Sequence, residues 1–210
     1  MSYAVKEIYL TVQGEGAQAG QVAVFLRFAG CNLWSGREKD RAGAVCSFCD
    51  TDFIGTDGEN GGRYSAGELA DKCASLWPET PGLRWVICTG GEPLLQLDDP
   101  LIAALKRRGF RIAVETNGTI AAPEGLDWIC VSPKADARVV QTSGHELKLV
   151  YPQPKNAPEQ FAHFDFEHFF LQPLDGEGVQ ADNTAAAFKY CLAHPQWRLS
   201  VQAHKYIGVP

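Results

Sequence analysis

The chain has 210 residues, 45% of them hydrophobic, which is enough for one sizeable core but short for two domains. Its formal net charge of −6 argues against a nucleic-acid surface, and it has neither an apolar run of about eighteen residues nor the N-terminal layout of a signal peptide. Seven cysteines without a secretory signal indicate a reducing compartment. We therefore expect one cytoplasmic domain over residues 1–210, with no membrane or nucleic-acid partner.

Short apolar runs rich in β-branched residues predict strands at 22–28, 84–88, 111–116, 128–132, 145–151, 168–173 and 198–204. Most of these runs are continuous, which is typical of parallel strands covered on both faces. Helical spacing appears instead at 65–77, 99–109 and 181–194. Ser65 and Glu68 form a capping box at the start of the first helix, and Pro78 ends it.

Alternating strands and helices predict an α/β fold. The links 117–127 and 133–144 are Gly- and Pro-bearing and about a dozen residues long, so each can hold a turn of helix at most. A full eightfold barrel typically takes about 250 residues. The sequence therefore predicts an incomplete, compressed (β/α) barrel with more strands than helices.

Three cysteines lie in one glycine- and charge-bearing loop, at Cys31, Cys46 and Cys49. A redox pair would leave Cys31 idle, and a structural zinc site needs four ligands although no second short Cys or His pair is present. An iron–sulfur cluster held by three cysteines leaves one iron open to a small-molecule ligand. Core packing is the better interpretation for the remaining cysteines, at Cys73, Cys88, Cys130 and Cys191.

Polar residues end several of the predicted strands, at Glu115, Asn117, Ser132, Lys134 and Gln172. The segment TGGEP (89–93) likewise follows the buried run 84–88. Active sites of barrels lie at the carboxyl ends of their strands, so these residues predict a mouth lined for a polar ligand.

GCNLW (30–34) followed by CSFCDT (46–51) and TGGEP resembles the radical S-adenosylmethionine (SAM) enzymes. Their usual signature is C-x3-C-x2-C, whereas here Ser35 stands at the position of the second cysteine and an eleven-residue insert, 35–45, precedes Cys46. The insert is charged and bears glycine, as a solvated loop should. A longer loop costs little, because closure entropy grows with the logarithm of length.

Within that superfamily the chain resembles the 7-carboxy-7-deazaguanine synthases of queuosine and deazapurine biosynthesis. The matching motifs run in order along the chain: TVQGEG (11–16), FLRFAGCNLW (25–34), CDT (49–51), TGGEP, ETNGT (115–119), SPK (132–134), LQPLDG (171–176) and LSVQAHKYIG (199–208). The resemblance implies a radical ring contraction of 6-carboxy-5,6,7,8-tetrahydropterin that releases ammonia and regenerates SAM. It also implies a [4Fe-4S] cluster, SAM and Mg²⁺ as cofactors, an electron donor such as a flavodoxin, and a homodimer.

The same resemblance assigns roles to individual residues. Cluster ligands are Cys31, Cys46 and Cys49, and the magnesium ligand is Thr51. Expected SAM-binding residues are Phe48, Asp50, Gly91, Glu92, Asn117, Ser132, Lys134 and Gln172. Expected substrate-binding residues are Gln13, Gly14, Glu15, Gly16, Arg27, Thr89 and Pro210; Arg27 would offer a planar fork to the substrate carboxylate, although a structural ion pair is its alternative role. His204 and Lys205 belong to the motif without a derived role.

Two other functions remain open at this point. A radical SAM activase that acts on a protein partner would share the cluster and SAM site but would need no pterin-reading QGEG segment. A non-enzymatic adaptor would bind zinc at the three cysteines instead.

Overall fold

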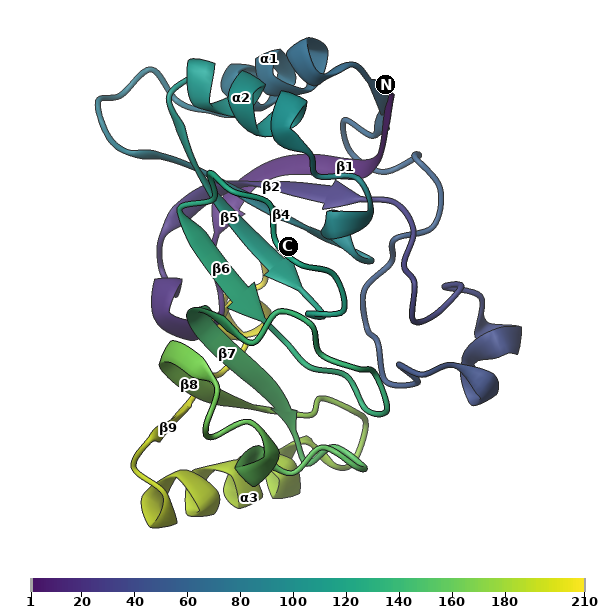
Figure 1. Ribbon diagram of the computed structural model, residues 1–210, viewed down its shortest axis with the longest axis vertical. Helices are drawn as coiled ribbons and strands as arrows, with labels where there is room; N and C mark the ends of the chain where they lie inside the picture. Colours follow the sequence, from purple (N-terminus) through teal and green to yellow (C-terminus); the bar gives the residue numbers. More distant parts are fainter. Residues whose placement is uncertain (1, 210) are drawn as a thin grey trace.

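The computed structural model describes residues 2–209, which form one nine-stranded sheet flanked by helices (Figure 1). In space the strands follow the order β3-β1-β2-β4-β5-β6-β7-β8-β9. Their bounds are Tyr3–Val12 (β1), Val22–Phe28 (β2), Gly62–Tyr64 (β3), Arg84–Gly90 (β4), Phe110–Thr116 (β5), Trp128–Val131 (β6), Ser143–Tyr151 (β7), Asp165–Pro173 (β8) and Trp197–Leu199 (β9). The sheet is open, as predicted, because its order ends at β3 and β9 rather than closing.

All neighbouring pairs from β2 to β9 are parallel, whereas β1 is antiparallel to both β2 and β3. Each predicted run contains a strand, but β1 and β3 are additional. The prediction of a strand over 198–204 is wrong beyond Leu199. After that residue the chain leaves the sheet to contact the loop after β1, where Ala203 N donates to Gly14 O at 2.8 Å, and then forms a short helix.

The helices are α1 (Ala66–Leu76), α2 (Asp99–Arg107), α3 (Gln180–Ala193) and α4 (Ala203–Ile207), with 3-10 turns at Gly16–Gln18, Glu38–Gly43, Pro93–Leu95 and Pro158–Gln160. The capping box is present: the Ser65 hydroxyl accepts from Glu68 N, and Glu68 accepts from Ser65 N. Neither predicted short link carries a helix. The helix α4 was not predicted, because five residues give no periodic signal.

Two apolar clusters hold the helices on the sheet. One joins α1 and α2 to β1, β2, β4 and β5, and the other joins α3 to β7, β8 and β9 at the opposite end of Figure 1. Three of the four cysteines predicted as core are buried, while Cys191 on α3 is only half-buried. Within residues 2–209, no helix has the length and hydropathy needed to cross a membrane.

Candidate active site

A cavity of about 410 Å³ lies at the carboxyl ends of the parallel strands. The strands contribute Arg27 from β2, Thr89 from β4, Glu115 from β5 and Lys148 from β7 to its wall. Other parts of the wall come from β1 and the loop after it, the segment around Cys46, β8, the loops after β5 and β6, and the chain after β9. The predicted mouth at this edge of the sheet is therefore present as a hollow.

Most of the predicted site residues line this cavity: Gln13, Gly14, Glu15, Arg27, Cys46, Phe48, Cys49, Asp50, Thr51, Thr89, Gly91, Asn117, Ser132, Lys134 and Gln172. Three others, Gly16, Cys31 and Glu92, are not among the lining residues. Pro210 lies outside the described residues.

The structure brings the three predicted cluster ligands together. The hydrogen bond between Cys46 and Cys49 raises the pKa of Cys46 and lowers the pKa of Cys49. Burial raises the pKa of Cys46 further. The charge of Cys31 adds to the rise at Cys46, and burial raises the pKa of the Cys31 thiol itself. Within residues 2–209 no three His, Cys, Asp or Glu side chains form a group fit for a single metal ion. These pairwise interactions place the three thiols near one another, as ligands of one iron–sulfur cluster would be.

Gly91 sits directly against the first of these ligands. A Cβ at this position would lie 2.1 Å from Gly30 O and 2.9 Å from the Cys31 Cβ, so only glycine allows the end of β4 to approach the cysteine. The glycine pair of TGGEP thus places the cavity wall beside the cluster ligands.

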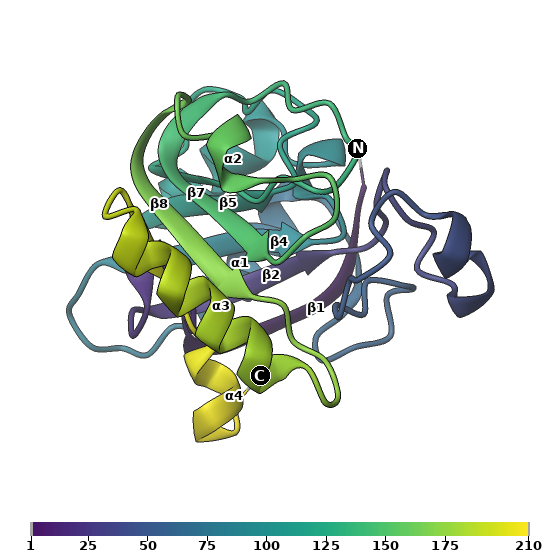
Figure 2. The ribbon, with the colours of Figure 1, turned by 90° about the horizontal axis from the view of Figure 1, so that it is seen from below.

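Arg41 connects the long insert to the cysteine pair. Its Nη1 donates to Ser47 O and to Cys49 O, both at 3.0 Å, and its guanidinium lies 4.1 Å from the centre of the Trp34 ring. The insert forms a 3-10 turn, Glu38–Gly43, that projects from the sheet, the dark-blue segment in Figure 2. The insert therefore folds back on the motif that it interrupts.

Glu92, predicted to contact SAM, is fully buried instead (0% exposed). Its carboxylate accepts from the Thr116 hydroxyl at 2.7 Å and from Asn117 N at 2.8 Å. In the described chain Glu92 therefore fixes the turn that carries Asn117, and Asn117 is the residue that reaches the cavity.

Arg27 lines the cavity and is also held in an ion pair. Its Nε donates to Glu7 Oε1 at 2.7 Å, and its Nη2 donates to the Tyr9 hydroxyl at 2.8 Å. Both partners lie on β1, and both line the cavity with it. The two roles considered for Arg27 are thus compatible, because the ion pair orients the guanidinium.

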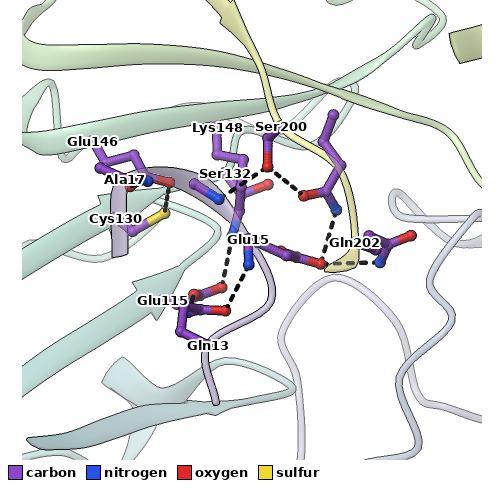
Figure 3. A network of polar contacts seen from close by, with 12 residues as sticks. Gln13, Glu15, Ala17, Glu115, Cys130, Ser132, Glu146, Lys148, Ser200 and Gln202 are labelled. Carbon is purple, nitrogen blue, oxygen red and sulfur yellow. Dashed lines mark hydrogen bonds and ion pairs between the residues drawn. The ribbon is translucent and has the colours of Figure 1, made fainter. Parts of the chain in front are cut away.

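A buried lysine organises the inner wall (Figure 3). Lys148 is 3% exposed, and its Nζ donates to Glu15 Oε2 at 2.6 Å and to Glu115 Oε2 at 3.0 Å. Burial alone would raise the pKa of Glu15, but the charge of Lys148 and its hydrogen bond outweigh burial and lower that pKa to about 2. Glu115 also accepts from Gln13 Nε2 at 2.6 Å. The Glu15 carboxylate and the Lys148 ammonium are therefore both charged, and the Glu115 side chain lies beside them.

The segment after β9 closes the wall over the loop at 13–16. Gln202 Nε2 donates to Glu15 Oε1 at 3.0 Å, and His204 packs against Gly14. Lys205 pairs with Asp50 in the cysteine loop at 3.0 Å and with Asp175 after β8 at 2.5 Å. His204 and Lys205, which had no role derived from the sequence, thus connect the segment after β9 to the loop at 13–16, the cysteine loop and the chain after β8.

Sequence reasoning missed Lys148 and Glu146 as site residues, although a signal was present. The run HELKLVY was interpreted as a buried strand, and it carries two charges two residues apart. Side chains at that spacing point to the same face of a strand, so the pair indicated a polar interior face. The β1 residues Glu7 and Tyr9 were missed because β1 itself was not predicted.

No protein-family model matches the chain, but curated proteins do. The chain is 69% identical to the 7-carboxy-7-deazaguanine synthase of Caulobacter vibrioides and 63% identical to that of Bordetella pertussis, each over 211 residues and 100% of both chains. Among solved structures it is similar to QueE from Escherichia coli, with a TM-score of 0.72 and 26% identity over 97% of this chain and 95% of that one.

Replacing Lys148 by methionine should destabilise the folded protein by about 3–5 kcal/mol at pH 7, because a buried ion-pair network with two partly buried carboxylates loses its cation. For a chain of this size that corresponds to roughly 6–20 °C in Tm, measurable by anaerobic thermal unfolding. The exposed ion pair of Lys155 and Asp136 provides the control, since Lys155→Met should cost at most about 1 kcal/mol.

The same variant should show a pH signature. In the wild type the depressed pKa of Glu15 contributes stability above the ordinary value of 4.5, which is lost as pH falls towards 2. Without the lysine, burial raises the pKa of Glu15, so the penalty should be largest at pH 7–8 and should shrink as pH falls and Glu15 takes up a proton. A penalty independent of pH would contradict the assignment of Lys148 as its counter-ion.

Proposed function

Because the chain belongs to the 7-carboxy-7-deazaguanine synthase family, we propose that it converts 6-carboxy-5,6,7,8-tetrahydropterin to 7-carboxy-7-deazaguanine with release of ammonia, a step of queuosine biosynthesis. The observation that supports this proposal is the cavity, which joins the thiols of Cys46 and Cys49 to a wall of acidic, basic and amide side chains. Family membership favours this synthase activity over the activase and over the zinc adaptor.

The inner wall suits the donor-rich edge of a pterin. Glu15 and Glu115 present carboxylate oxygens, and Gln13 and Gln172 present amides, all within one hydrogen-bonded network. Lys148 pairs with both acidic side chains, and carboxylate oxygens accept hydrogen bonds from ring N–H and amino groups. Arg27, oriented by Glu7 and Tyr9, is the group that would bind the substrate carboxylate.

The residues present fit the cofactors of this chemistry. Cys31, Cys46 and Cys49 would hold a [4Fe-4S] cluster, and Asn117, Ser132, Lys134 and Gln172 would bind SAM along the strand ends. When bound, the cluster and SAM would supply the radical that takes hydrogen from the substrate. The side chains on the cavity wall hold the pterin close to that radical and restrict access of water, with Lys205 joining the rim segments above it.

Thr51 is proposed as a ligand of Mg²⁺, a hard cation that takes oxygen ligands. It lines the cavity between Asp50 and Asp52. Lys6 pairs with Asp52 at 2.9 Å and with Asp57 at 2.8 Å, which fixes the loop beside Thr51.

We further propose a cytoplasmic homodimer that receives electrons from a flavodoxin-type donor. Exposed apolar residues on α3 (Phe188 and Leu192) and on α4 (Tyr206 and Ile207) provide surfaces that could form a contact between copies. Light scattering coupled to gel filtration measures the oligomeric state, and turnover supported by a reduced flavodoxin measures the electron transfer.

The activity is tested directly with reduced, cluster-loaded protein, SAM and 6-carboxytetrahydropterin deuterated at the carboxylate-bearing carbon. We expect ammonia and 7-carboxy-7-deazaguanine by chromatography, many turnovers per SAM, and deuterium in SAM or deoxyadenosine. Omission of Mg²⁺ should slow turnover in the wild type and should have less effect in Thr51→Ala. A fully loaded protein that yields neither product nor deuterium transfer overturns the proposed substrate.

Arg27→Ala should lower kcat/KM by roughly ten- to a hundredfold, equivalent to about 1.5–3 kcal/mol, because the substrate carboxylate loses a charge-assisted partner. Arg27→Lys should recover part of this, since a point charge cannot reproduce a planar fork. Steady-state kinetics of the wild type and both variants measure kcat/KM. Equal activity of all three proteins would show that Arg27 has only a structural role, in its ion pair with Glu7.

Alanine at Cys31, Cys46 or Cys49 should abolish the cluster, whereas the other four cysteines should be dispensable for it. The reason is placement, since the thiols of the first three interact with one another in the cysteine loop and the others lie in the core or on α3. Iron content and visible absorbance after reconstitution are the measurements. A cluster that survives Cys31→Ala but not Cys73→Ala would refute the ligand set.

A further inference from the structure

Glu146 is a buried acid to which the proposed reaction gives no role. It lies on β7, is 3% exposed, and faces the same side of the strand as Lys148, two residues later. Burial raises the pKa of its carboxyl. An unpaired buried carboxyl would be costly, so its partners indicate what it does in the fold.

Those partners belong mainly to the loop after β1. Ala17 N donates to Glu146 Oε2 at 2.9 Å, and Cys130 Sγ donates to Oε1 at 3.6 Å (Figure 3). Gly16 adopts φ +63°, and a Cβ there would lie 1.9 Å from Glu146 Oε1. The loop backbone therefore rests directly on this carboxyl, and only glycine permits the contact.

The contact fixes the residue that follows Glu15. Glu15 lies one position before Gly16, and its side chain turns to the other partner on β7, Lys148, at 2.6 Å. Strand β7 thus holds the loop twice, through Glu146 at the backbone and through Lys148 at the carboxylate. Ser200 Oγ accepts from Gly16 N at 2.9 Å and supports the loop from the opposite side.

We propose that Glu146 is a positioning residue for pterin recognition: by holding the backbone at Gly16 and Ala17, it directs the Glu15 carboxylate into the cavity. Glu146 does not line the main cavity, so it acts through Glu15 rather than on the substrate. This role rests on the proposed function, because it assumes that Glu15 binds the pterin edge.

The test compares Glu146→Met, which fills the volume but cannot accept the Ala17 N–H, with Glu146→Gln, which keeps a carbonyl oxygen for it. Affinity is measured with 6-carboxypterin, the oxidised fluorescent form of the substrate, on cluster-loaded protein. Glu146→Met should weaken binding about tenfold, because small misplacements of a binding group are costly, and should raise KM by a similar factor. Glu146→Gln should stay within about threefold of the wild type. Iron content and SAM affinity should not change.

Two controls separate positioning from general destabilisation. Asp127 accepts from Ile112 N at 2.8 Å away from the cavity, so Asp127→Asn should leave the affinity for 6-carboxypterin unchanged. In a Glu15→Gln background, Glu146→Met should have little further effect, because both changes remove the same contact. Equal and additive losses in the two backgrounds would overturn the proposal.

Amide hydrogen exchange on the wild-type holoenzyme gives a second measurement that needs no variant. The amide of Ala17 should be protected in the folded protein, and exchange at the rate of an open loop would overturn the inference. The proposed function fails separately, if the wild type does not convert the pterin at all. If it does and Glu146→Met shows wild-type affinity, only the positioning role is wrong.

Discussion

The ion pairs of Lys148 are the interaction on which the rest of this site depends. A lysine 3% exposed can remain charged only if opposite charges reach it, and here Glu15 and Glu115 do so from two different elements. The requirement fixes the loop after β1, strand β5 and strand β7 relative to one another. It also keeps Glu15 ionised and holds both acidic side chains on the cavity wall, so the constraint on the fold is the same one that prepares the binding surface.

The sheet could be predicted from sequence to the extent that its strands are continuously apolar. Parallel strands that are buried on both faces have continuously apolar sequences, and every such run in this chain contains a strand. Strand β1 lacks that signal, because YAVKEIYLTV mixes charged with apolar residues. Its polar side chains turn out to face the cavity, where Glu7 and Tyr9 hold Arg27. Strand β1 was therefore missed because the polar side chains that it contributes to the site interrupt its apolar pattern.

Site residues at strand ends were predictable for a geometric reason, since the carboxyl ends of parallel strands converge. Ser132, Lys134 and Gln172 line the cavity accordingly. The orientation of a side chain was not predictable from a motif. Glu92 belongs to TGGEP, yet its side chain points into the protein and accepts hydrogen bonds from Thr116 and Asn117. The charges of HELKLVY indicated a polar face for Lys148, but its pairing with the distant Glu15 and Glu115 needed the three-dimensional structure. Sequence therefore indicated which segments meet, and the structure decided which atoms face the cavity.

The closure of the loop at 13–16 by the segment after β9 has a consequence for protein synthesis. The hydrogen bond from Gln202 to Glu15 joins residues 187 positions apart, so one wall of the cavity leaves the ribosome long before its partner. Contacts of such long sequence separation form late, because the loop they close must first be ordered. A nascent chain can therefore assemble its core of α1, α2 and the central strands while the cavity is still open on one side. Fusion partners appended after this segment would sit beside the rim, whereas those placed before β1 would lie next to β3 and α1.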